Sequence, residues 1–98
     1  MDMNVLVNQI PMTAPVGVVP GSLRWTLSAN GVIVQQDIDN TPQHTFSNVQ
    51  PNTDYLVDVA RLDSSGNVLH SVDQQTTSPN GPTGDTYLGP VALSISYT

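Results

Sequence analysis

A turn leads directly into a tyrosine-headed strand in the stretch Val49-Gln50-Pro51-Asn52-Thr53-Asp54-Tyr55-Leu56-Val57-Asp58-Val59. Proline and asparagine favour turns, and the residues from Tyr55 onward alternate between two faces. This combination is typical of the corner where a β-sandwich passes its chain from one sheet to the other. We expect a structural corner built by Val49, Pro51 and Tyr55. Pro51 presets a backbone angle, and the Tyr55 hydroxyl bonds the preceding loop.

The rest of the chain also alternates with the period of a strand and never with that of a helix for three turns. Gly and Pro number 7 and 8 and punctuate it throughout. Asn30-Gly31 is a strong signal for a tight hairpin. Met12 to Gly21 is expected as an extended edge or loop, with room for a short strand at Val16 to Val19. The expected strands are Asn4 to Ile10, Ser22 to Ser28, Val32 to Ile38, His44 to Asn48, Tyr55 to Leu62, Val68 to Gln75 and Val91 to Thr98.

Seven or eight short strands at roughly 8–12-residue spacing predict an all-β fold, an antiparallel sandwich of two sheets. The alternation assigns to its core Leu23, Trp25, Leu27, Phe46, Val57 and Val59. An exposed Trp25 would suit stacking on a carbohydrate, but its apolar neighbours at positions 23 and 27 favour the core. Tyr87, beside Gly89 and Pro90, is the better candidate for an exposed aromatic side chain.

The composition of the 98 residues excludes several classes of function. A net charge of −6 with two arginines and no lysine opposes binding to nucleic acid and to anionic membranes. The chain has no cysteine, so disulfides and thiolate chemistry are excluded. It has no apolar run long enough to span a membrane, and we expect no signal peptide from the acidic start of the sequence. We expect a single domain over residues 1–98, either a small complete gene product or a piece of a longer protein.

No constellation of catalytic or metal-binding residues is recognisable. His44 and His70 stand on separate strands without the spacing of metal ligands, which favours two solvent-facing residues. Most aspartates fall in turns or on polar strand faces, where they bond local backbone. Asp63 to Asn67 is expected as a hairpin loop, because it lacks the downstream glutamate of a calcium loop. We therefore expect no enzyme, no cofactor and no metal.

The segment 23–77 resembles a fibronectin type III domain of the immunoglobulin-like superfamily. The family's corner, an apolar residue followed by x-Pro-x-Thr-x-Tyr, stands here at Val49 to Tyr55, and its next strand at Tyr55 to Arg61. The family's Asp-Ser-x-Gly-Asn loop stands at Asp63 to Asn67. The hairpin around Asn30-Gly31 is similar to that of bacterial and phage members. The resemblance implies a two-sheet sandwich that serves as a scaffold.

Both ends of the chain depart from the family pattern. The segment before Trp25 is short for two leading strands, and residues 78–90 form a connector rich in Ser, Thr, Pro and Gly. Residues 91–98 add a strand with Val91, Leu93, Ile95 and Tyr97 on one face. This strand belongs to its own domain, or it is an interaction strand that pairs with another protomer by edge or strand exchange. A homo-oligomer would follow from the second alternative.

We expect a non-enzymatic structural or interaction module that acts through contacts with protein. The leading hypothesis is a small accessory protein of a phage virion, a capsid decoration or a tail-attached domain, with capsid, tail or its own copies as partner. The alternative is an accessory domain of a secreted bacterial enzyme or adhesin. That domain would be extracellular or at the cell surface and would bind carbohydrate or another surface. Exposed aromatic side chains favour the alternative.

Overall fold

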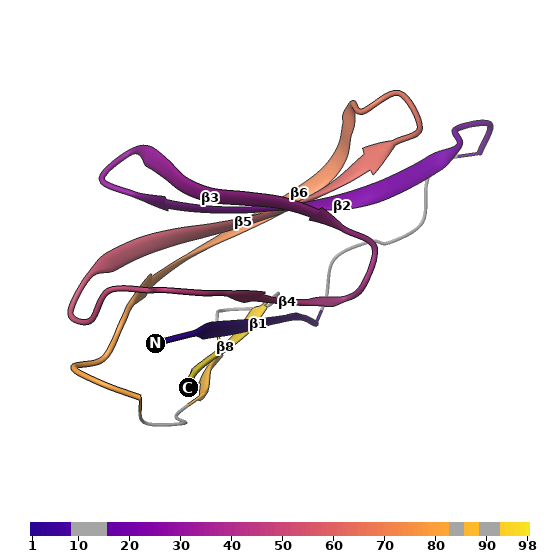
Figure 1. Ribbon diagram of the computed structural model, residues 1–98. Helices are drawn as coiled ribbons and strands as arrows, with labels where there is room; N and C mark the ends of the chain where they lie inside the picture. The colour runs from indigo at the N-terminus through magenta and orange to yellow at the C-terminus, as the bar shows by residue number, and fades with distance from the viewer. Residues whose placement is uncertain (9–15, 83–85, 89–92) are drawn as a thin grey trace.

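Eight strands make up the regular structure of the described residues, which are 1–8, 16–82, 86–88 and 93–98 of a computed structural model (Figure 1). These residues contain no helix, and so none that could cross a membrane. The strands are β1 (Met3–Val7), β2 (Pro20–Ala29), β3 (Val32–Asp39), β4 (Gln43–Phe46), β5 (Asp54–Asp63), β6 (Val68–Thr77), β7 (Thr86–Leu88) and β8 (Leu93–Tyr97).

The strands form two antiparallel sheets of four, in the orders β4-β1-β8-β7 and β3-β2-β5-β6. Figure 1 shows the sheets as two layers, with β2, β3, β5 and β6 in one and β1, β4 and β8 in the other. The prediction of an all-β sandwich with two antiparallel sheets is confirmed. The strands β2, β5 and β6 have ten residues each, whereas those of the other sheet have three to five.

The larger sheet consists of two hairpins, β2–β3 and β5–β6, joined along β2 and β5. Asn30 and Gly31 turn the first hairpin with φ of 52° and 77°, which these two residue types tolerate. In the second hairpin, the Asp63 carboxylate accepts the backbone N–H groups of Ser65 and Asn67, both at 2.8 Å. Local chemistry therefore sets both hairpins.

The smaller sheet joins the two ends of the chain. Strand β1 pairs with β8 from Met3↔Tyr97 to Val7↔Leu93 and with β4 on its other side. The pairing continues past the strands, because the backbones of Asp2 and Thr98 exchange two hydrogen bonds of 2.7 and 3.0 Å. Strand β8 thus lies within the sheet of its own chain. Exchange of this strand between two copies stays a prediction.

Near both ends of the chain, the structure differs from what the sequence predicted. Residues 78–90 were expected as a connector, but they include strand β7, which pairs with β8. Three residues among Gly and Pro give too little alternation to be recognised. The segment 16–19 is a turn and irregular backbone, and not a strand. Ile10 and Val91 lie outside the described residues, as do positions 83–85 and 89–90 of the connector.

The core lies between the two layers and takes alternate residues from five strands, which are β1, β2, β4, β5 and β8. The six residues assigned to it from the sequence, Leu23, Trp25, Leu27, Phe46, Val57 and Val59, are all fully buried. The smaller sheet adds its own inward-facing residues, which are Met3, Val5, Leu93, Ile95 and Tyr97. The second group lies entirely on β1 and β8, so five of the thirteen buried residues of the core require these two strands to be in place.

Tyr55 anchors the corner that carries the chain from β4 to β5. Its ring is buried, and its hydroxyl accepts the backbone N–H of Gln50 at 2.9 Å. A second residue, Ser78, ties the corner to the end of β6. Ser78 is only 2% exposed. Its hydroxyl accepts a hydrogen bond from the N–H of Thr53 at 3.0 Å and donates one to the carbonyl of Gln50 at 2.5 Å. The sequence analysis did not single out Ser78, because a serine in a polar loop carries no distinguishing signal.

Replacing Tyr55 by Phe removes the hydroxyl and leaves the N–H of Gln50 without that acceptor. We expect the free energy of unfolding to fall by about 1 kcal/mol, the ordinary net value of one hydrogen bond. Urea denaturation followed by far-ultraviolet circular dichroism measures it. Tyr87→Phe is the matched control, since it removes an exposed hydroxyl. An equal effect of both substitutions would contradict the anchoring role of Tyr55.

Replacing Ile95 by Ala opens a cavity in the middle of the core. We expect a loss of about 2–4 kcal/mol in the free energy of unfolding, because Ile95 is fully buried at the centre of the smaller sheet. Ser96→Ala is the control on the opposite face of the same strand and should cost less than about 0.5 kcal/mol. Similar values for the two variants would show that β8 does not pack in the core in solution.

Candidate functional site

Strand β3 carries the largest group of exposed apolar side chains on one element among the described residues. We call Val32, Ile33, Val34 and Ile38 the β3 apolar strip; their exposed fractions are 63, 59, 50 and 66%. Strand β3 lies at the edge of the larger sheet, so one side of its backbone has no strand neighbour. Ile33 and Ile38 pair with Ser28 and Arg24 on the outer face of β2, whereas Val32 pairs with Ala29, which packs against the core. The strip therefore wraps around the sheet edge, and exposed apolar side chains grouped on one edge strand mark an interaction surface.

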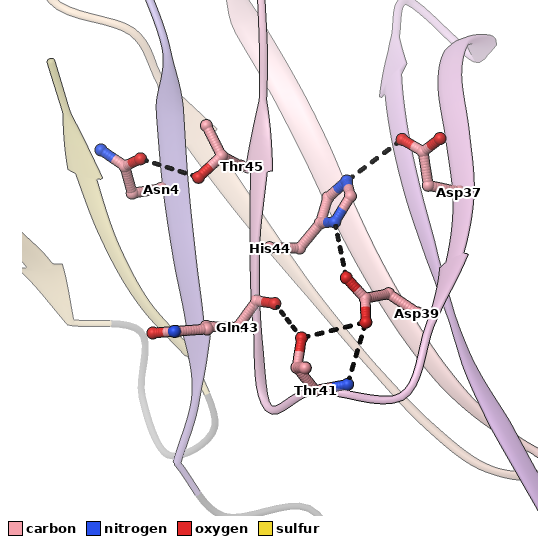
Figure 2. A network of polar contacts seen from close by, with 7 residues as sticks. All are labelled: Asn4, Asp37, Asp39, Thr41, Gln43, His44 and Thr45. Carbon is pink, nitrogen blue, oxygen red and sulfur yellow. Dashed lines mark hydrogen bonds and ion pairs between the residues drawn. The ribbon is translucent and has the colours of Figure 1, made fainter.

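The inward-facing side chains of β3 are fastened to the smaller sheet (Figure 2). The Nε2 atom of His44 lies 3.1 Å from Oδ2 of Asp37, and its Nδ1 atom lies 3.8 Å from Oδ2 of Asp39. Gln35 donates from Nε2 to the carbonyl of Ser47 at 2.5 Å. These contacts close the side of the sandwich at which β3 and β4 form the edges. The outer face of β3 is left to solvent.

His44 is a bridge between the sheets. Its side chain is 14% exposed and stacks on the Trp25 ring, with centroids 5.4 Å apart and planes at 24°. The Phe46 ring meets it edge-on at 4.9 Å. Within the described residues, no group of three or more His, Asp or Glu side chains could hold a metal ion. The arrangement positions β3 against the core and leaves the imidazole little access to a substrate.

Thr41 fixes Asp39 at the end of β3 (Figure 2). Its backbone N–H and its hydroxyl both donate to Oδ1 of Asp39 at 3.1 Å. These bonds hold the pKa of Asp39 below its ordinary value, and the backbone bond has the larger effect. Because the folded pKa is lowered, the stabilising contribution is present above the unfolded pKa and is lost as the pH falls through the folded pKa.

Two features of β3 oppose the addition of a further strand to its edge. The register with β2 shifts between Leu27 and Ser28, so a β-bulge interrupts the strand beside Val34. The carboxylates of Asp37 and Asp39 point inward beneath the edge. Bulges and inward-pointing charges are known devices against edge-to-edge pairing. A partner of the β3 apolar strip would therefore contact its side chains and not extend the sheet.

A groove of about 820 Å³ lies at the end of the sandwich near the β2–β3 hairpin. Tyr87 lines it from β7 and Asp54 from the start of β5. Tyr87 is 44% exposed, and its hydroxyl accepts a hydrogen bond from the Gln74 side-chain amide at 3.1 Å. The expectation of an exposed Tyr87 thus agrees with the structure, whereas Trp25, the other aromatic considered for stacking, is fully buried.

The outer face of the larger sheet brings two carboxylates together. Asp58 on β5 lies directly opposite Asp73 on β6. Burial, and then the charge of Asp73, raise the pKa of Asp58, while Arg24 acts in the opposite direction. Because the folded pKa is raised, the contribution of Asp58 to stability is present below the unfolded pKa. It is lost as the pH rises through the folded pKa.

Of the other residues named from the sequence, Tyr55 and Tyr97 also line the groove, and His44 contacts β3. His44 and His70 stand on different sheets and are both half-buried. Val49 and Tyr55 are buried at the corner, and Pro51 is exposed there. Of the proposed interaction strand, Leu93, Ile95 and Tyr97 face the core of their own chain. The β3 apolar strip was missed, although the run of three aliphatic residues after Asn30-Gly31 is a usable signal.

Comparisons with family models, with curated proteins and with solved structures found no match to this chain.

Replacing Asp58 by Asn should raise the free energy of unfolding at pH 7 by a few tenths to about 1 kcal/mol, the cost of like charges directly opposite in a sheet. The gain should shrink as the pH falls and the Asp58 carboxyl, whose pKa is raised, becomes protonated. Urea denaturation at several pH values measures it.

Asp63→Asn is the control, and it should change the free energy of unfolding in the opposite direction. The backbone N–H of Asn67, and weaker bonds from the same loop, lower the pKa of Asp63 against the effect of burial. Removing that charge should therefore destabilise the protein at pH 7. A destabilising effect of Asp58→Asn would contradict the assignment of repulsion between Asp58 and Asp73.

Proposed function

We propose that this protein is a non-enzymatic interaction module that docks on another protein through the β3 apolar strip. The observation that carries the proposal is the exposure of Val32, Ile33, Val34 and Ile38, each at least half accessible on one strand. The polar contacts of His44 and Gln35 hold the strand in place from within, so the strip is presented on a fixed support. A pre-ordered surface loses little conformational entropy on binding.

The strip suits a partner with many identical sites. Covering one half-exposed aliphatic side chain contributes on the order of 1 kcal/mol, so four give a weak single contact. Weak contacts become effective when a surface repeats and several linked copies bind together. Low charge at the strip and a net charge of −6 favour a protein surface over nucleic acid. A repeated protein surface is what an assembled particle offers.

In this proposal the chain is an immunoglobulin-like domain of the fibronectin type III kind, and a small accessory protein of a phage virion. Support for the family comes from the strand order β3-β2-β5-β6, built from two hairpins, and from the corner with its Tyr55 hydrogen bond. What supports the virion is the resemblance of the hairpin around Asn30-Gly31 to that of bacterial and phage members of the family. As such a protein, the chain decorates a capsid or is attached to a tail, and it works there as a scaffold.

The experiment is co-sedimentation of the purified chain with purified particles of the phage whose genome encodes it. We expect the unmodified chain to pellet with the particles. Ile33→Lys combined with Ile38→Lys should reduce the bound amount at least tenfold, because both charges would have to be desolvated at the interface. Val68→Lys is the matched control, an exposed aliphatic residue of β6 outside the strip. It should bind as the unmodified chain does.

Two results would overturn the proposal. One is mass spectrometry that fails to detect this chain in purified virions. The other is equal binding of the double variant and of Val68→Lys, with circular dichroism showing that all three proteins are folded. The first result removes the virion as the setting, and the second removes the β3 apolar strip as the docking surface.

A further inference from the structure

The groove at the end of the sandwich is separate in its chemistry from the β3 apolar strip. Its described lining carries hydrogen-bonding side chains from five strands and the β2–β3 turn, among them Asn30, Asp54, Gln75, Thr77, Thr86 and Tyr87. Amide and hydroxyl groups can donate and accept hydrogen bonds, whereas an ionised carboxylate only accepts them. None of the described residues that line the groove is Lys, Arg or His. This composition offers no counter-charge to a phosphate or a sulfate.

Tyr87 gives the groove its one exposed aromatic ring. All five aromatic side chains of the protein lie in the described residues, and the other four are at most 6% exposed. The amide of Gln74 holds the Tyr87 hydroxyl at 3.1 Å, which limits the rotation of the ring before any ligand arrives. An exposed ring whose position is already restricted binds at a low cost in entropy. Its apolar face can cover the C–H face of a pyranose.

Asp54 supplies the strongest acceptor in the groove. Its Oδ1 atom accepts the hydroxyl of Thr77 at 2.6 Å, which orients the carboxylate. A carboxylate accepts up to about four hydrogen bonds, so capacity remains for the hydroxyl groups of a ligand. The same charge, in a protein of net charge −6, repels a uronate or a sialylated sugar. The electrostatics therefore select for a neutral ligand.

We propose that this groove binds a neutral saccharide, with a pyranose ring stacked on Tyr87 and its hydroxyl groups bonded to Asp54 and Asn30. A volume of about 820 Å³ accommodates two to three sugar rings, within the usual range for ligand sites. This function is independent of the docking function proposed above, because none of the four strip residues lines the groove. A module with both surfaces would dock on a protein and hold a glycan.

The test is a titration of the ¹⁵N-labelled chain with four soluble hexasaccharides, followed by nuclear magnetic resonance. Chitohexaose, maltohexaose and mannohexaose are neutral, and hexagalacturonate is the acidic comparison. We expect at least one neutral hexamer to shift the amide signals of Asp54, Thr77 and Tyr87 with a millimolar or lower Kd. Hexagalacturonate should cause no shift at the same concentration.

Variants separate the roles of the groove residues. Tyr87→Ala should weaken binding at least tenfold, whereas Tyr87→Phe, which keeps the ring, should stay within about threefold. Asp54→Asn should weaken binding of the neutral hexamer and reduce the discrimination against hexagalacturonate. Val68→Ala, remote from the groove, is the control. The proposal is overturned if no neutral hexamer shifts these signals, or if Tyr87→Ala binds as tightly as the unmodified chain with its fold intact.

Discussion

The pairing of the two chain ends is the constraint on which this structure depends. Strands β1 and β8 lie side by side at the centre of the smaller sheet, and their inward-facing residues fill the part of the core that β2 and β5 cannot fill. The larger sheet is made of two local hairpins, but its apolar face needs this second layer for burial. The contact joins residues 86 to 94 positions apart, so its loop-closure entropy opposes early formation.

Local chemistry supports this long-range closure at the end of the sandwich where the chain ends meet. The Tyr55 hydroxyl and the Ser78 hydroxyl both bond the backbone of the corner, and Ser78 brings the end of β6 to it. The connector that follows therefore leaves from a fixed point. From there it leads through β7 to β8. The corner is thus more than a crossing between sheets, because it also sets where the C-terminal strand begins its approach.

The two candidate surfaces follow from positions at the edges of this frame. Strand β3 ends the larger sheet; its Asp37 and Gln35 are fastened to the smaller sheet, and its aliphatic side chains are exposed around the edge. Strand β7 ends the smaller sheet and presents Tyr87 to a groove of polar groups. One surface is apolar, and the other is rich in hydrogen-bonding groups with a single exposed aromatic ring. Their chemistry differs enough to suit different ligands.

The sequence by itself determined the two hairpins, the corner and the inward face of β2 and β5. Asn30-Gly31, Asp63 to Asn67 and the alternation from Tyr55 are short-range signals that need no knowledge of the partner strand. Tertiary structure alone decided that β8 lies beside β1, that Thr86 to Leu88 form a strand, and that Ser78 is buried. It also decided that His44 meets Asp37 and Asp39 across two sheets. These features depend on which segments become neighbours, and the period of two in a strand specifies its faces but not its partners.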